Sequence, residues 1–123
     1  MATKTEPNRS AAEAPTGDAP VRGCCGLIEP GMGADDAAIV ADRFKALADP
    51  TRVRILNLLA HNPELCVCDL NASFDLSQPT ISHHLGILKK AGLVDCDVRG
   101  RWCFYRARPE AINELARVLE VKT

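Results

Sequence analysis

The feature that most constrains the fold is residues 77–107, where one helical segment is followed directly by two strand-like runs. Ser77 is a good N-cap, and a proline two residues later is tolerated in the first turn of a helix. The apolar side chains that follow recur at helical spacing, namely Ile81, Leu85 and Leu88. Ala91-Gly92 then ends the segment. The runs LVDCDV and RWCFYRA come next and meet at Arg99-Gly100, which predicts a β-hairpin.

Four more helices are predicted around this unit. The first runs from Ala34 to near Asp49-Pro50, with apolar side chains at Ile39, Val40, Phe44, Leu47 and Ala48. Pro50 suits the first turn of a second helix, which His61-Asn62-Pro63 breaks. A short third helix covers about 67–74, and a closing helix covers about 109–119. This order predicts a mainly α (α+β) winged helix-turn-helix with a hairpin wing and a closing helix.

Residues 1–33 differ in composition from the rest of the chain. They are rich in Ala, Pro, Gly and Thr and hold few large apolar side chains, so burial cannot offset the entropy of ordering them. We therefore expect a flexible arm over 1–33 that carries Cys24-Cys25. Residues 34–123 are expected to form the winged helix-turn-helix domain.

Composition narrows the class of protein. No run approaches the roughly 18 apolar residues of a membrane span, and no signal segment opens the chain, so a cytoplasmic protein without a membrane partner is expected. Six cysteines in a reducing compartment indicate thiols, metal ligands or redox switches rather than a disulfide framework. The formal net charge is −1, yet residues 77–108 hold six basic and two acidic side chains. That local surplus suits phosphate contact.

The fourth predicted helix has a polar face suited to the major groove of DNA. With its apolar stripe turned inward, short hydrogen-bonding side chains project from the first two turns: Gln78, Thr80, Ser82 and His83. Lys89 farther along can pair with phosphate, and Arg99 and Arg101 at the hairpin tip can reach a neighbouring groove. Taken singly, each of these residues is more typical of a solvated surface, but the helix-turn-helix layout favours contact with DNA. His84 lies about 100° from His83 on a helix and is expected to be packed and hydrogen bonded.

Several motifs in order resemble the ArsR/SmtB family of dimeric winged-helix repressors that sense metals. They are LADPTRVRILNLL, ELCVCDL, LSQPTISHHLGILKKAGLV and the RGRWCFYRA hairpin, over about residues 36–120. The resemblance implies a homodimer joined through its first and last helices, and loss of operator DNA on metal binding. It also implies control of efflux or detoxification genes. The family's other site, built from Asp and His on the last helix, is not expected because residues 109–120 contain no His.

The ELCVCDL box holds two of the candidate metal ligands. Cys66 and Cys68 point about 200° apart on a regular helix, so both reach one ion only if Cys66 lies at or before the helix start. Two sulfurs are too few for a soft ion, and Cys24 and Cys25 are the other source. In the family, such sites join an N-terminal segment to this helix. Arsenic-sensing relatives with a self-contained box have a third cysteine where this chain has Asn71.

Trivalent arsenic takes three thiolates, which Cys24, Cys25 and Cys66 can supply. With Cys68 the set becomes four, which suits cadmium or lead. The expected function is therefore a repressor that binds operator DNA as a dimer and releases it on binding arsenite or antimonite, with cadmium or lead as alternative inducers.

Two other readings of the cysteines stay open. A two-residue turn at Arg99-Gly100 places Cys96 directly opposite Cys103, either as small apolar wing residues or as a redox or accessory metal pair. A thiol-redox regulator is the alternative function. An enzyme with a Cys–His nucleophile is not expected, because the sequence offers no oxyanion loop or orienting triad.

Overall fold

The computed structural model describes residues 21–24, 26–28 and 31–121. The chain divides into two compact units, Met1–Val40 and Ala41–Thr123. Among the described residues, no helix has the length and apolar character needed to cross a membrane.

The described part of the first unit contains a small antiparallel ribbon that the sequence did not predict. Strand β1 (Val21–Gly23) pairs with β2 (Gly26–Ile28), and Cys24 lies exposed in the turn between them. Cys25 lies outside the described residues. Most of the predicted flexible arm is also outside them, so its flexibility and the domain boundary at residue 33 stay predictions.

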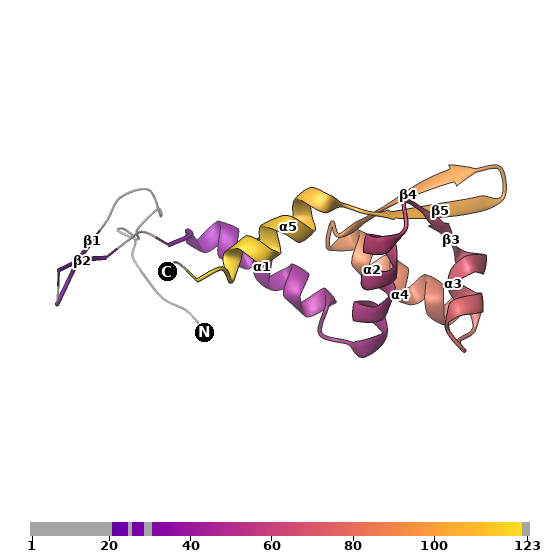
Figure 1. The fold of residues 1–123 in the computed structure, drawn as a ribbon, viewed down its shortest axis with the longest axis horizontal. Coiled ribbons are helices and arrows are strands. Elements are labelled where there is room, and N and C mark those ends of the chain that lie inside the picture. The colour runs from indigo at the N-terminus through magenta and orange to yellow at the C-terminus, as the bar shows by residue number, and fades with distance from the viewer. Residues whose placement is uncertain (1–20, 25, 29–30, 122–123) are drawn as a thin grey trace. The chain divides into compact units, whose positions relative to one another are not determined.

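Five helices form within the described residues (Figure 1): α1 (Ala34–Ala46), α2 (Pro50–His61), α3 (Val67–Ser73), α4 (Gln78–Lys90) and α5 (Pro109–Val118). Helix α1 ends before the predicted Asp49-Pro50. The reason is that Asp49 is extended, with φ −149° and ψ 130°, and serves as the N-cap of α2. Its carboxylate accepts the backbone N–H groups of Thr51 and Arg52 at 2.9 and 3.2 Å. The bond from Arg52 is the main cause of the lowered pKa of the Asp49 carboxyl group.

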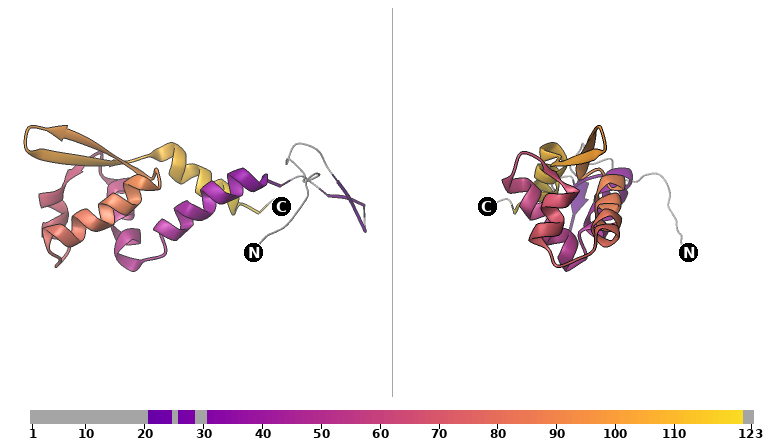
Figure 2. Two further views of the ribbon diagram at one scale, coloured as in Figure 1. Left: turned by 180° about the vertical axis from the view of Figure 1, so that it is seen from behind. Right: turned by 90° about the vertical axis from the view of Figure 1, so that its right-hand side faces the viewer.

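A three-stranded antiparallel sheet completes the second unit. Strands β4 (Val94–Arg99) and β5 (Trp102–Ala107) form the predicted hairpin, and β3 (Leu65–Cys66) pairs with the outer side of β5, giving the order β3-β5-β4. The hairpin runs along one side of α2 and α4 and projects at the same end of the domain as α3 (Figures 1 and 2). The winged helix-turn-helix architecture is thereby confirmed, apart from β3, which was not predicted.

The register of the hairpin corrects one prediction. The turn lies at Gly100-Arg101, not at Arg99-Gly100, and Gly100 adopts a φ of 64° that favours glycine. Cys96 therefore faces Tyr105, and Cys103 faces Val98. The two cysteines are diagonal neighbours on one face of the sheet and not directly opposed.

The core of the second unit positions helix α4. Its predicted inward stripe is fully buried at Ile81, Leu85 and Leu88. The helix ends as expected at Ala91-Gly92: Gly92 has a φ of 80°, and the N–H of Leu93 donates to the carbonyl of Leu88 at 3.0 Å. This pattern satisfies carbonyl groups at the helix end and turns the chain into β4. Burial of the stripe fixes which face of α4 is left for solvent.

Candidate functional site

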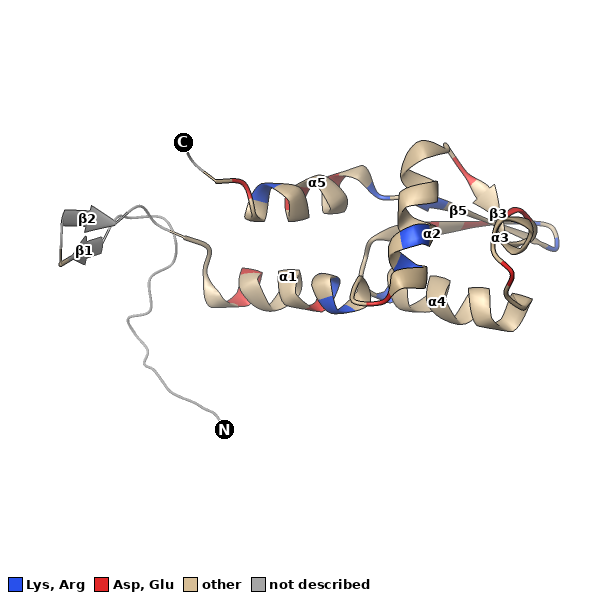
Figure 3. Ribbon diagram, turned by 60° about the horizontal axis from the view of Figure 1, so that its bottom comes forward, with Lys and Arg blue, Asp and Glu red and all other residues tan. Residues whose placement is uncertain are grey.

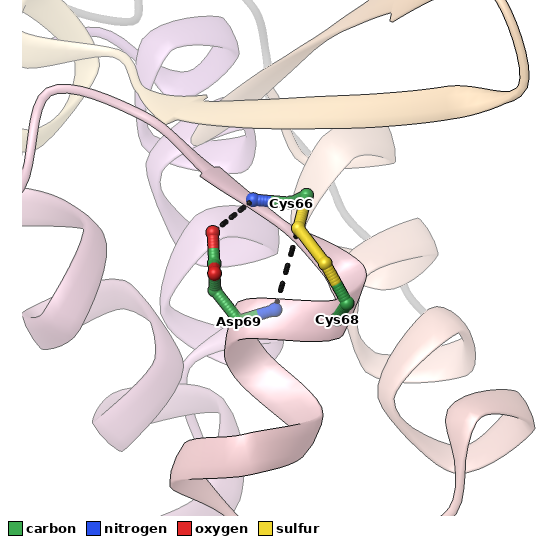
Figure 4. Close-up of side chains that lie close together, drawn as sticks. All are labelled: Cys66, Cys68 and Asp69. Carbon is green, nitrogen blue, oxygen red and sulfur yellow. Dashed lines mark hydrogen bonds between the residues drawn. A yellow bond between two sulfur atoms is a disulfide. The ribbon is translucent and has the colours of Figure 1, made fainter.

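The two cysteines of the ELCVCDL box meet at the start of α3 (Figure 4). Cys66 is the N-cap of that helix, with φ −85° and ψ 167°, as the geometry of a shared site required. The N–H of Asp69 donates to the Cys66 sulfur at 3.4 Å, and the N–H of Cys66 donates to the Asp69 carboxylate at 3.0 Å. Cys66 is 6% exposed, whereas Cys68 and Asp69 are open to solvent. The cap thus brings both sulfurs to one side of the first turn.

The sulfurs of Cys66 and Cys68 are joined as a disulfide, with their Cα atoms 5.3 Å apart. The expectation of free thiols is therefore wrong for this pair in the state that the structure represents. A disulfide offers no thiolate, the form that binds soft metals, so occupancy by a metal requires reduction of this bond first. Once reduced, the pair presents two thiolates side by side, one of them stabilised by the N–H of Asp69.

The donor set around this pair fits a thiophilic ion in part. Within the described residues, one group of three candidate ligands has all its ligand atoms within 4.8 Å of one another: Cys66, Cys68 and Asp69. Two thiolates and one carboxylate leave a soft ion short of sulfur, because arsenic, cadmium and lead favour three or more thiolates. Cys24 is exposed in its turn, and Cys25 is not described. Of the four predicted ligands, the second unit holds Cys66 and Cys68, which it brings together, while Cys24 belongs to the first unit.

The cysteine box is connected to the wing through strand β3. Cys66 pairs with Phe104 of β5, and Glu64, two residues earlier, binds the wing residue Arg99. Both guanidinium Nη atoms of Arg99 donate to the Glu64 carboxylate, at 2.8 and 2.7 Å, while its Nε donates to Asp97 at 2.9 Å. The guanidinium also lies 4.5 Å from the centre of the Phe104 ring. These hydrogen bonds raise the pKa of Arg99, and the bond from Arg99 is the main cause of the lowered pKa of Glu64.

This network was not predicted from the sequence. Arg99 was expected to reach DNA, and the structure instead turns it back onto its own sheet. Nothing in the local sequence marks Glu64 as its partner, since the two are separated by 34 intervening positions. The neighbouring Arg101 is exposed within the turn.

The polar face of α4 is exposed as expected. Gln78, Ser82, His83 and Lys89 are open to solvent, whereas Thr80 is half-buried. Ser77 caps the helix by accepting the N–H of Thr80 at 3.3 Å, and the two hydroxyl groups are hydrogen bonded at 2.9 Å. Basic side chains lie on α4's last turn and on the hairpin (Figure 3). The unit therefore offers both hydrogen-bonding groups near a helix start and positive charge, the combination that suits DNA.

His84 is a packed residue, as predicted. It is half-buried, and its Nδ1 lies 3.2 Å from Nη1 of Arg52. Arg52 also donates through Nε to the carbonyl of Ala46 at 2.6 Å, so it links the end of α1 to α4. His84 is thereby accounted for structurally, and exposed His83 remains the candidate for DNA contact.

The sequence matches a known family over the helix-turn-helix itself. Residues 49–95 match the family described as "Bacterial regulatory protein, arsR family". The chain is also 46% identical over 80 residues to an uncharacterized HTH-type transcriptional regulator of Methanocaldococcus jannaschii, a match that covers 65% of this chain and 90% of that one. This chain belongs to the ArsR family.

Other ArsR relatives carry names that include a metal or metalloid. The chain is 44% identical to the arsenical resistance operon repressor of Escherichia coli K12, covering 63% of this chain and 66% of the relative. It is also 44% identical to the cadmium resistance transcriptional regulatory protein CadC of Listeria innocua, covering 57% and 59%. The chain thus spans less than two thirds of these two relatives.

Solved ArsR structures share the fold. A homodimeric winged helix-turn-helix DNA-binding domain from Mycobacterium bovis is 33% identical, with a TM-score of 0.60, over 72% of this chain and 84% of that one. This ArsR protein is therefore a DNA-binding transcriptional repressor, not an enzyme. The similarity does not fix which ion an ArsR protein recognises, because its relatives are named for both arsenic and cadmium.

Proposed function

We propose that this protein is a metal(loid)-responsive repressor that binds operator DNA as a homodimer and releases it when a thiophilic ion binds. The proposed inducer is arsenite or antimonite, and the proposed ligands are Cys24, Cys25, Cys66 and Cys68. The observation that carries the proposal is the placement of two sulfurs together at the start of α3, with Cys66 on the strand that pairs with the wing. De-repression of resistance genes in the cytoplasm would follow.

The proposed DNA interface is the exposed face of α4 together with the hairpin. Its residues are Gln78, Thr80, Ser82, His83, Lys89 and Arg101, joined by Arg99 when its ion pair with Glu64 opens. Support comes from the exposure of these side chains, apart from half-buried Thr80, and from the helix-turn-helix that positions α4. Exposed apolar side chains directly after the last helix, Leu119 at 68% and Val121 at 79%, support a dimer surface there.

The proposed link between the ion and the DNA is the β3 strand. Closing thiolates around an ion at Cys66 moves the backbone that also carries Glu64, and Glu64 holds Arg99 of the wing. A coupling free energy of about 1–3 kcal/mol between two sites changes affinity roughly 5–150-fold. The same factor applies in both directions, so operator DNA must weaken inducer binding by as much as inducer weakens operator binding.

Two alternatives each have an observation in their favour. Cadmium or lead as inducer is favoured by four sulfurs in place of three and by the relative named for cadmium resistance. A thiol-redox regulator is favoured by the Cys66–Cys68 disulfide. In that function the oxidation state of the pair, with no ion bound, would set the affinity for DNA.

One assay tests all three. An operator selected from random duplex DNA is bound by the fully reduced protein, and release is followed by fluorescence anisotropy with arsenite, antimonite, cadmium, lead and zinc. The proposal expects release by arsenite and antimonite at the lowest concentrations, and loss of that response when Cys24→Ser and Cys25→Ser are combined. Release by cadmium or lead alone would establish the first alternative. Release by peroxide in the presence of a chelator, with no response to any ion, would establish the second.

A further inference from the structure

A second pair of cysteines lies on the wing, on the opposite face of the sheet from Cys66. Cys96 on β4 and Cys103 on β5 are free, half-buried thiols. The register places them diagonally on one face of the sheet. The Cys96 thiol and partial burial raise the pKa of Cys103, while the nearby Lys89 ammonium group acts in the opposite direction. The pair thus lies on the face of the wing that is near α4.

The diagonal arrangement suits a bridging atom better than a disulfide. Diagonal residues of an antiparallel pair have Cα atoms about 7–8 Å apart. A disulfide usually joins Cα atoms about 4.4–6.8 Å apart, so a direct S–S bond requires the strands to shift. A single atom bonded to both sulfurs lengthens the link and leaves the hairpin register as it is.

In the part of the chain that the structure describes, this pair has no third protein ligand of the usual kinds beside it. Within the described residues, Cys96 and Cys103 do not join any cluster of three His, Cys, Asp or Glu ligands. Their neighbours on the same face are instead Val98, which is opposite Cys103 and 65% exposed, and Tyr105, which is opposite Cys96. Burial is the main reason that the pKa of Tyr105 rises to about 12, so its ring is neutral and presents carbon surface. Two thiols beside apolar groups therefore suit a ligand that brings its own organic third substituent.

We propose that Cys96 and Cys103 form a dithiol site for trivalent arsenicals that carry one organic group. In the reaction, each thiol replaces one hydroxide of a dihydroxyarsine, the two protons leave with the hydroxides as two waters, and two As–S bonds form. Arsenic stays trivalent, so no oxidant or reductant is needed. The organic group completes three-coordination and packs against Val98 and Tyr105. This site goes beyond the proposed function, because it takes another class of ligand at another place.

The test uses phenylarsine oxide as the probe, which hydrates to a dihydroxyarsine. The full-length protein carries Cys24→Ser, Cys25→Ser, Cys66→Ser and Cys68→Ser, so only the wing thiols remain. Native mass spectrometry should detect one phenylarsenic per chain. Trp102, the sole tryptophan and the neighbour of Cys103, should report binding by a change in fluorescence. A dithiol such as 2,3-dimercaptopropanol should reverse binding far more effectively than a monothiol.

The matched controls separate chelation from ordinary thiol reactivity. Adding Cys96→Ser should weaken binding by roughly 100-fold, because a two-point attachment becomes one-point. Adding Asp95→Cys to that variant brings the number of wing thiols back to two but places the new thiol on the opposite face of β4. It should therefore not restore affinity. Unchanged affinity after Cys96→Ser, or full recovery with Asp95→Cys, would overturn the site.

A second measurement does not depend on any variant folding. Wild-type protein with its α3 disulfide intact is treated with phenylarsine oxide and then with iodoacetamide, and modified peptides are mapped. One arsenical should protect Cys96 and Cys103 together. Protection of only one of them, or none, would contradict the proposal. Because it probes the wing while the α3 pair is oxidised, this result is separable from failure of the proposed function.

Discussion

The carboxylate of Glu64 holds the guanidinium of Arg99 through two hydrogen bonds of 2.8 and 2.7 Å, although the two residues belong to the cysteine box and the wing. Glu64 lies two residues before Cys66, at the edge of the sheet, and Arg99 is the last residue of β4. A wing residue that could meet phosphate is therefore held by the segment that carries the proposed metal ligands. This contact is a side-chain connection between the two proposed sites, beside the backbone pairing of Cys66 with Phe104.

The first prediction concerns the protonation of this pair. In wild-type protein the pKa of Glu64 lies below its ordinary value, and Arg99→Gln should raise it by removing the donating guanidinium. A carboxyl group with a lowered folded-state pKa contributes stability above its unfolded pKa and loses it as pH falls through the folded pKa. The melting temperature of the wild-type protein should thus exceed that of the Arg99→Gln variant near neutral pH, and the two values should converge on acidification. NMR titration of the Glu64 carboxyl carbon gives the pKa directly, and an equal pKa in both proteins would show that the ion pair is absent in solution.

The second prediction concerns phosphate contact. Replacing Arg101 with Gln should weaken operator and non-operator DNA alike, and it should reduce the slope of log affinity against log salt by about 1. Gln78→Ala should instead reduce discrimination between operator and altered sequences, at a cost of about 1–3 kcal/mol. Arg117→Gln on α5 is the matched control for loss of one positive charge. A salt slope that changes equally in the Arg101 and Arg117 variants would contradict the proposed wing contact.

The third prediction compares two glycines of the DNA-reading segment. Gly92 has a φ of 80°, so Gly92→Ala should destabilise the protein by about 1–2 kcal/mol. Gly86 lies within α4, and a Cβ added there meets no atom within 4 Å, so Gly86→Ala should stabilise it by about 0.5–1 kcal/mol. Urea denaturation of both variants measures this. If the free energy of unfolding changed in the same direction in both variants, the end of α4 would differ from the turn described above.

The fourth prediction concerns the oxidation state of the α3 pair. Protein with the Cys66–Cys68 disulfide has no thiolate there, so arsenite should fail to release it from the operator. Reduction with a phosphine, followed by its removal, should restore release. The Cys68→Ser variant, which cannot form this bond, serves as the control for oxidation elsewhere. Equal release from oxidised and reduced protein would exclude Cys66 and Cys68 as ligands.

Much of the fold could be predicted because its boundaries are marked by single residues with local effects. Ser77 and Pro50 mark helix starts, and Gly92 marks a helix end, through hydrogen bonds within a few positions. The apolar stripe of α4 is likewise read directly from its spacing. The end of α1 was placed too late because Asp49 was read as part of that helix, when it caps the next one.

The parts that were missed depend on contacts between distant residues. A turn at Arg99-Gly100 and a turn at Gly100-Arg101 give registers that differ by two residues. Each side chain keeps its own face of the sheet in both registers, so the alternation of side chains along the strands cannot distinguish them. Strand β3 has two residues, too few to show a period. For the candidate metal site, the sequence predicts which cysteines are ligands and requires Cys66 to lie at the start of a helix, as it does. Its hydrogen bonds with Asp69 and the connection from Glu64 to the wing required coordinates.

The most direct test of the central claim is arsenite-driven release of operator DNA from reduced wild-type protein and from Cys66→Ser. The variant should bind operator within about twofold of wild type, because Cys66 lies outside the proposed DNA face, and arsenite should no longer release it. Cys103→Ser, which also removes one thiol, should respond to arsenite as wild type does. Release of the Cys66 variant at the arsenite concentrations that release wild type would contradict the claim that this N-cap sulfur senses the inducer.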